Sequence, residues 1–257
     1  MRKLPLIALL LLGSPAWAAE WTESVSFLVK TDGSPSGTAH VYDSEDFQRM
    51  LILFEDREQA AVLDLATVSV SAIPADSIRS SETDGALHSP EGIGSYLAPL
   101  EQEEGTLSFL WNETPVTIEP VPPLIGPVDR ERVFAVKPTY ETAAKEYEPA
   151  EEAAAALRAV DAPTEIHVFF GTWCHACKKS VPPLIGTIDR VGNDRFTMRF
   201  IGVDEDLTEP AEEIDRYYVS TTPTIVVLQN GGEIGRIEDE PVVSVEADLV
   251  AILKSKR

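Results

Sequence analysis

The chain has 257 residues, of which 43 are acidic and 21 basic, so its formal net charge is −22. The negative charge is spread over both halves, which argues against nucleic acid and anionic membrane surfaces as partners, because both repel an acidic surface. A basic protein partner is compatible with this charge, although a solvated acidic surface accounts for it without any partner. The length is sufficient for two domains with separate hydrophobic cores.

The first eighteen residues have the pattern of a secretory signal peptide. Arg2 and Lys3 precede an apolar run at residues 4–12, and the segment 16–18 (Ala-Trp-Ala) fits the small-x-small cleavage pattern. We expect cleavage after Ala18, which removes both basic residues and takes the formal charge from −22 to −24. The apolar run is short for a membrane span, so an uncleaved anchor is the less favoured alternative. The expected location is periplasmic or secreted, without stable membrane association.

Residues 19–119 predict a small β-rich domain whose role the sequence does not indicate. Short apolar runs with strand-like character alternate with turn signals. Residues 80–94 are polar and contain glycine and proline, which predicts a long loop. His40 and His88 are isolated, so we expect surface or packing roles for both. The predicted strands are residues 24–29, 50–54, 67–73, 106–111 and 115–118.

Residues 120–140 carry five prolines and are predicted to be a connector between domains. The hexapeptide Val-Pro-Pro-Leu-Ile-Gly occurs at 121–126 and again at 181–186. Nothing around the two copies repeats, which favours coincidence over duplication. We expect the second copy to be helical, whereas Pro127 opposes a continuous helix in the first.

Residues 141–257 alternate between helical and strand patterns. This order predicts an α/β domain with a mixed central sheet flanked by helices. Pro182 is expected to kink the second helix. The predicted helices are 150–160, 174–190, 210–218 and 245–254, and the predicted strands are 165–170, 197–203, 224–229 and 233–238.

The only two cysteines, Cys174 and Cys177, stand three positions apart directly after the apolar run 166–170. A strand followed by Cys-x-x-Cys at the start of a helix is typical of a redox site. A structural disulfide is the alternative interpretation. Such a short spacing closes a very small loop and constrains the unfolded chain little, so it is a poor structural cross-link.

The segment 169–179, Phe-Phe-Gly-Thr-Trp-Cys-His-Ala-Cys-Lys-Lys, together with Pro182 resembles the active-site segment of thioredoxin-fold proteins. The sequence Gly-Thr-Trp-Cys-x-x-Cys-Lys-Lys is most similar to that of the extracytoplasmic thioredoxin-like proteins of bacteria. The segment Thr222-Pro223-Thr224 is the second point of resemblance. Proteins of this family have a cis threonine–proline bond at this place, and that bond lies against the active-site disulfide. The resemblance covers residues 141–257 and implies a thioredoxin-like domain acting on protein dithiol or disulfide clients.

The resemblance and general chemistry together assign roles to these residues. Cys174 is expected at a helix N-terminus, where free N–H groups and the helix dipole favour the attacking thiolate. Cys177, one turn later, is the expected resolving thiol. His175, when cationic, stabilises the thiolate and makes the site more oxidising. Trp173 is expected to cover one side of the site.

The pair Thr222-Pro223 is expected to hold the backbone beside the cysteines open for an extended client segment. Lys178 and Lys179 are interpreted as solvated helix residues. His167, in the strand beside the site, is interpreted as a packing residue.

Two features depart from a standard thioredoxin site. Thioredoxins carry a buried aspartate six positions before the first cysteine, and here that position is Val168. The His-Ala pair between the cysteines matches neither the reductants' Gly-Pro nor the strong periplasmic oxidants' Pro-His, so it leaves the direction of electron flow open. Only 45 residues separate Cys177 from Pro223, which leaves no room for the oxidants' inserted helical domain. We therefore favour a reductase or exchange role, with a membrane electron donor as a further partner.

Other functions of the cysteine pair fit the sequence less well. Haem attachment requires Cys-x-x-Cys-His and is excluded by Lys178. A structural zinc site needs four ligands, more than this segment supplies. Cu(I) transfer between soft thiolates is the main alternative, and a client-binding module with a minor redox role is another. The prediction is an oxidoreductase that needs no metal or cofactor beyond its dithiol.

Overall fold

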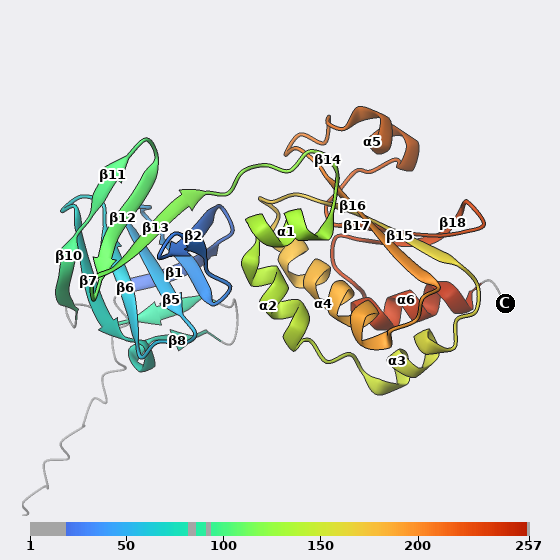
Figure 1. Ribbon diagram of the computed structural model, residues 1–257, viewed down its shortest axis with the longest axis horizontal. Helices are drawn as coiled ribbons and strands as arrows, with labels where there is room; N and C mark the ends of the chain where they lie inside the picture. The colour runs from blue at the N-terminus through green and yellow to red at the C-terminus, as the bar shows by residue number, and fades with distance from the viewer. Residues whose placement is uncertain (1–18, 82–85, 91–93, 256–257) are drawn as a thin grey trace, which may run out of the picture.

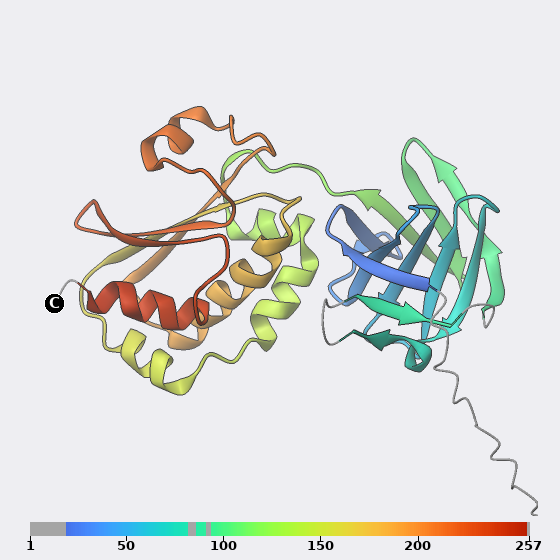
Figure 2. The ribbon, with the colours of Figure 1, turned by 180° about the vertical axis from the view of Figure 1, so that it is seen from behind.

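The computed structural model describes residues 19–81, 86–90 and 94–255. Within these ranges the chain forms a β-rich domain and an α/β domain, which lie side by side and are joined by the segment after strand β13 (Figures 1 and 2). The signal peptide predicted at residues 1–18 lies outside the described residues. Over the described ranges, no helix is long and apolar enough to cross a bilayer.

Two antiparallel sheets packed face to face make up the β-rich domain. The larger has the strand order β10-β7-β6-β5-β4-β1-β9-β8, and the smaller has the order β11-β12-β13-β2-β3. Side chains from both sheets, including Ile52, Phe109 and Ile118, form the core between them. The bounds are β1 (Ala19–Ser24), β2 (Phe27–Thr31), β3 (Ser34–Pro35), β4 (Ala39–Ser44), β5 (Arg49–Phe54), β6 (Gln59–Asp64), β7 (Ser69–Pro74), β8 (Arg79–Ser80), β9 (Leu87–Ser89), β10 (Ser95–Pro99), β11 (Glu101–Glu103), β12 (Thr106–Trp111) and β13 (Thr114–Pro120), with a 3-10 turn at Ala75–Ser77.

The predicted strands at 50–54, 67–73, 106–111 and 115–118 are confirmed, but the prediction of one strand over 24–29 was wrong. The chain leaves the larger sheet after β1 and enters the smaller one at β2, so the pattern spans two elements. The predicted loop at 80–94 contains β9, which pairs with β1. Strands β4 and β6 were not predicted, because their polar and alanine residues give a weak strand signal.

The predicted connector ends earlier than residue 140. Strand β14 (Gly126–Val128) already pairs with β16 of the α/β domain, and helices α1 (Arg130–Val136) and α2 (Pro138–Glu146) follow. The side chain of Asp129 accepts a hydrogen bond from the N–H of Arg132 (2.7 Å), which caps α1. Pro138 takes the first position of α2, where its missing N–H leaves no helical bond unmade.

The α/β domain is built on a mixed sheet in the order β14-β16-β15-β17-β18. Strands β15 and β16 are parallel, and their other neighbours are antiparallel. Helices α1 to α4 and α6 cover one face with Val168 and Phe170 in the core, while α5 covers the other face over Phe169 (Figure 1). The bounds are α3 (Glu151–Arg158), β15 (Thr164–Phe170), α4 (His175–Val191), β16 (Phe196–Gly202), α5 (Ala211–Tyr217), β17 (Thr224–Gln229), β18 (Gly232–Glu238) and α6 (Val245–Lys254).

All predicted elements after residue 141 are confirmed, with ends that differ by at most two residues. Helix α4 continues as one element through Pro182 and Pro183. The repeated hexapeptide adopts two conformations, because its first copy runs without helical structure into β14 and its second lies inside α4. The repeat is therefore not a structural duplication.

Candidate functional site

The cysteine pair lies where β15 ends and α4 begins. Cys174 is the N-cap residue of α4, and its sulfur accepts a hydrogen bond from the N–H of Cys177 (3.0 Å). This donor, together with the helix dipole, favours negative charge on the Cys174 sulfur when the pair is reduced. The expected position of Cys174 at a helix N-terminus is confirmed.

The two cysteines form a disulfide with their Cα atoms 5.3 Å apart, so the structure shows the oxidised form of the pair. Cys174 keeps 4% of its surface exposed, whereas Cys177 is completely buried. An incoming sulfur therefore reaches Cys174 first. The predicted roles of attacking and resolving thiol fit this difference in exposure.

Trp173 packs against the core cluster that contains both cysteines, and Gly171 leaves room for its ring. The indole Nε1 of Trp173 donates a hydrogen bond to the carbonyl of Val203 (3.3 Å). A Cβ atom at position 171 would lie 2.3 Å from the Trp173 ring, so any side chain there has to displace the ring. The glycine in Phe-Phe-Gly-Thr-Trp is thus required by the position of the tryptophan.

The segment Thr222-Pro223 lies on the other side of Cys174. Its peptide bond is cis, as the resemblance implied. The carbonyl oxygen of Thr222 is 3.5 Å from the Cys174 sulfur. Because the sulfur carries no proton in the disulfide, this is a contact rather than a hydrogen bond. The structure thus brings together two segments that are 48 residues apart.

The core beneath the pair is apolar at the position where thioredoxins carry an aspartate. Val168 is completely buried in the same cluster as both cysteines. Glu246 is the buried carboxylate among the described residues, and it accepts hydrogen bonds from Tyr147 (2.8 Å) and from the N–H of Ala150 (3.4 Å) rather than facing the pair.

Three of the remaining predicted residues make their contacts away from the cysteines. His167 is buried in an edge-to-face contact with Tyr217 (ring centroids 5.2 Å apart), and burial lowers its pKa, which agrees with a packing role. Lys179 forms an exposed ion pair with Glu240 (2.9 Å). His88 lies in β9, a strand of the larger sheet of the β-rich domain.

Three of the remaining residues meet at the β-rich domain, which the sequence did not predict. The exposed His175 donates from Nε2 to the backbone oxygen of Glu23 (2.9 Å). The ammonium of Lys178 forms an ion pair with the carboxylate of Glu23. The same carboxylate lies 3.4 Å from Nδ1 of His40. No local sequence signal could have identified Glu23, because its contacts on α4 are more than 150 residues away.

Glu23 is electrostatically well matched to this position. Burial raises its pKa, but the hydrogen bonds and charges of His40 and Lys178 outweigh burial and lower the pKa to about 2. Lys137 lies in the same region, where burial and the charge of Lys178 lower its pKa to about 8. Its ammonium donates to the backbone oxygen of Val25. In the described part of the chain, no three metal-ligating side chains cluster.

Comparison with known proteins gives one family. Residues 151–254 match the family model described as Thioredoxin. A thioredoxin from Echinococcus granulosus is 35% identical over 69 residues, which cover 27% of this chain and 59% of that relative. The chain therefore spans somewhat more than half the length of this curated relative.

Two solved structures are also similar. A protein of unknown function from Pseudomonas aeruginosa is 14% identical with a TM-score of 0.39, and the match covers 46% of this chain and 86% of that one. Thioredoxin-2, described as a component of malaria parasite protein secretion machinery, is 25% identical with a TM-score of 0.29, and the match covers 37% of this chain and 85% of that one.

Proposed function

Because residues 151–254 belong to the thioredoxin-fold superfamily, we propose that this protein is an exported thiol–disulfide oxidoreductase that acts on the disulfides of client proteins, with reduction as its favoured direction. The predicted fold class, a thioredoxin-like α/β domain preceded by a β-rich domain, is confirmed. The domain and its Cys-x-x-Cys pair support a thiol redox protein. The export, the clients and the direction are parts of the proposal.

The observation that carries the proposal is the position of the Cys174 sulfur. It accepts the N–H of Cys177 at the start of α4 and lies against the carbonyl of Thr222. The N–H of Cys177 and the start of the helix stabilise a thiolate at this position. Cys174 is also the cysteine that an incoming disulfide can reach. The Thr222-Pro223 segment beside the sulfur is where we expect a client segment to lie.

The reaction proceeds through two exchanges of sulfur. In the reduced protein, the Cys174 thiolate attacks a client disulfide, and one client sulfur leaves as a thiolate. Cys177, once deprotonated, attacks the Cys174 sulfur and releases the second client sulfur. Two electrons have then passed from the protein to the client, and the Cys174–Cys177 disulfide seen in the structure is formed. A dithiol such as dithiothreitol returns the protein to its reduced form.

The short chain segment between the cysteine pair and Pro223 supports reduction of the client as the favoured direction. The chain from the end of α4 to Pro223 contains β16 and α5 and no inserted helical domain. The reduction potential of the pair, measured in equilibrium with glutathione, tests this part directly. A value near that of reducing thioredoxins supports it, whereas a value near that of strong oxidants contradicts it.

The proposal of export rests on the sequence pattern of residues 1–18. Its test is the mass of the native protein recovered from its cell of origin. A mature chain that begins at Ala19 in the extracytoplasmic fraction is the expected result. An intact chain recovered from the cytoplasm would show that this part of the proposal is wrong.

The activity is tested by reduction of insulin with dithiothreitol as the electron source. Cys174→Ser should abolish the catalysed reaction, and Cys177→Ser should accumulate mixed disulfides with insulin. Cys174→Ser is the matched control in the trapping experiment, because it cannot form the first bond. Turnover by Cys174→Ser at the wild-type rate would overturn the proposed function.

A further inference from the structure

The cysteine pair lies on the side of the α/β domain that faces the β-rich domain. His175 and Lys178 belong to the first turn of α4, the turn that carries both cysteines. Each contacts Glu23 at the end of β1, His175 through the backbone oxygen (2.9 Å) and Lys178 through the carboxylate. Strand β1 is therefore held against the turn on which the redox reaction takes place.

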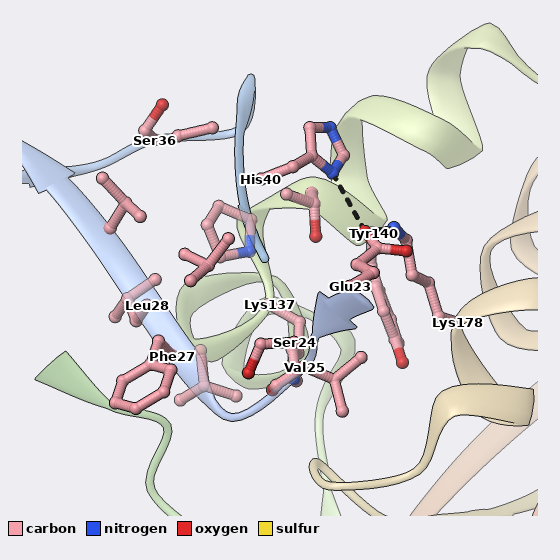
Figure 3. A pocket seen from close by; sticks show the side chains of 16 residues that line it. Glu23, Ser24, Val25, Phe27, Leu28, Ser36, His40, Lys137, Tyr140 and Lys178 are labelled. Atoms are coloured by element: carbon pink, nitrogen blue, oxygen red, sulfur yellow. Dashed lines mark hydrogen bonds and ion pairs between the residues drawn. The ribbon is translucent and has the colours of Figure 1, made fainter. Parts of the chain in front are cut away.

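Glu23 also has a partner inside the β-rich domain, His40. Its carboxylate points between His40 and Lys178 (Figure 3). His40 in turn lies 3.0 Å from the carboxylate of Glu55 through its Nε2 atom. Glu23 thus links strand β4 of one domain to helix α4 of the other.

A second group of contacts fixes the same orientation of the domains. The buried ammonium of Lys137, just before α2, donates to the backbone oxygen of Val25. A Cβ atom at Gly37 would lie 2.5 Å from Oγ1 of Thr142 in α2. The contacts surround a cavity of about 40 Å³, enough for one or two water molecules. The domains therefore touch at several points rather than through one ion pair.

These contacts limit how a client can approach Cys174. Trp173 packs against the core cluster that contains Cys174, and the carbonyl of Thr222 lies 3.5 Å from the Cys174 sulfur. The next residue, His175, is held by the β-rich domain. Only 4% of the surface of Cys174 is exposed in this arrangement. A narrow approach of this kind admits an extended chain segment more easily than the surface of a folded protein.

We propose that the β-rich domain forms one wall of the client site and that Glu23 is the positioning residue that holds this wall against the redox turn. The wall selects flexible, extended disulfide-bearing segments over folded proteins. This inference rests on the proposed function and assigns the β-rich domain a role in it. Glu23 contacts neither cysteine and acts through the position of the domain.

The test compares two substrates, a short fluorescent peptide with an internal disulfide and folded insulin. The measured quantity is the ratio of kcat/KM for insulin to kcat/KM for the peptide, with dithiothreitol as reductant. Glu23→Gln removes the charge that pairs with Lys178 but keeps the backbone oxygen. Gly37→Leu separates the domains sterically without changing any charge.

Both variants should raise the ratio by about fivefold, the shift expected when a two-state population loses one partly exposed ion pair or an equivalent contact. Two matched controls should keep the wild-type ratio. Glu119→Gln removes a similarly exposed ion pair, the one with Lys30, inside the β-rich domain. Gly232→Leu adds the same side chain in the hairpin between β17 and β18, where only the carbonyl of Gln229 lies within 4 Å.

An unchanged or lower ratio in both variants would overturn the inference. A rise in Gly37→Leu alone would overturn the role of Glu23, and a rise in Glu23→Gln alone would overturn the claim that Glu23 acts through the position of the domain. The glutathione-equilibrated reduction potential provides a second readout. A shifted potential with an unchanged ratio would show that Glu23 acts on the dithiol and not on access. Failure of the wild-type protein to reduce either substrate would instead contradict the proposed function itself.

Discussion

Glu23 and Lys178 are 155 residues apart in the sequence and form an ion pair between the two domains. Both side chains are about 70% covered, since 30% of the Glu23 side chain and 28% of the Lys178 side chain remain exposed. An ion pair that is partly removed from water is screened less by salt than one on an open surface. The pair connects the charge of the β-rich domain to the turn that carries the cysteines.

The first prediction concerns acid. The pKa of Glu23 is lowered to about 2, so its contribution to stability is complete above its ordinary value of about 4.5 and is lost as the pH falls towards 2. Glu23→Gln should reduce the free energy of unfolding at pH 6 by on the order of 2 kcal/mol, after allowance for partial exposure, and by only a small part of this at pH 2. Denaturant unfolding between pH 2 and 6 measures this difference. A difference that does not depend on pH would contradict it.

The second prediction concerns alkaline pH. The pKa of Lys137 is lowered from about 10.5 to about 8, chiefly by burial, so the unfolded chain binds more protons than the folded one between these values. Stability should therefore rise through this window, by about 3 kcal/mol from this residue. Lys137→Met should abolish that part of the rise. Lys145→Met, at a side chain that is 72% exposed, is the matched control and should retain it.

The third prediction concerns Gly171 and Trp173. A Cβ atom at position 171 would lie 2.3 Å from the indole, so Gly171→Ala should displace the ring and weaken its bond to Val203. We expect a loss of about 1–3 kcal/mol in stability, the usual cost of overpacking. A double-mutant cycle with Trp173→Phe checks the cause, because the smaller ring should make the same substitution less costly. An equal cost in both backgrounds would show that the ring is not what the glycine accommodates.

The fourth prediction concerns the order in which the reduced cysteines react. Cys174 is the more exposed of the two, and its sulfur accepts the N–H of Cys177. Limiting iodoacetamide at neutral pH should therefore modify Cys174 before Cys177, as peptide mass spectrometry will show. Faster modification of Cys177 would contradict this order and would make Cys177 the attacking thiol.

Much of the α/β domain could be predicted because its signals are local. The alternation of strands and helices after residue 141 and the Cys-x-x-Cys pair at a helix start are both visible in short windows of sequence. Helices α1 and α2 were missed because five prolines in 120–140 indicated a connector. Pro138 in fact begins a helix, a position that proline tolerates well.

The β-rich domain was harder to predict for a different reason. A strand is stabilised by neighbours far along the chain, so its own residues determine it only weakly. Residues 24–29 were predicted as one strand, although the chain changes sheets after Ser24. The pairing of β9 with β1 could not be predicted from the sequence for the same reason.

The sequence by itself determined the thiol redox chemistry that we propose for this protein, because two neighbouring cysteines, a helix start and a threonine–proline pair are features of short segments. Only the tertiary structure decided what surrounds that chemistry. The contacts of Glu23 with His175 and Lys178 depend on how two domains pack, and packing is a property of surfaces that no single segment contains. The position of Val168 in an apolar core likewise became clear only when the whole cluster around the cysteines was assembled.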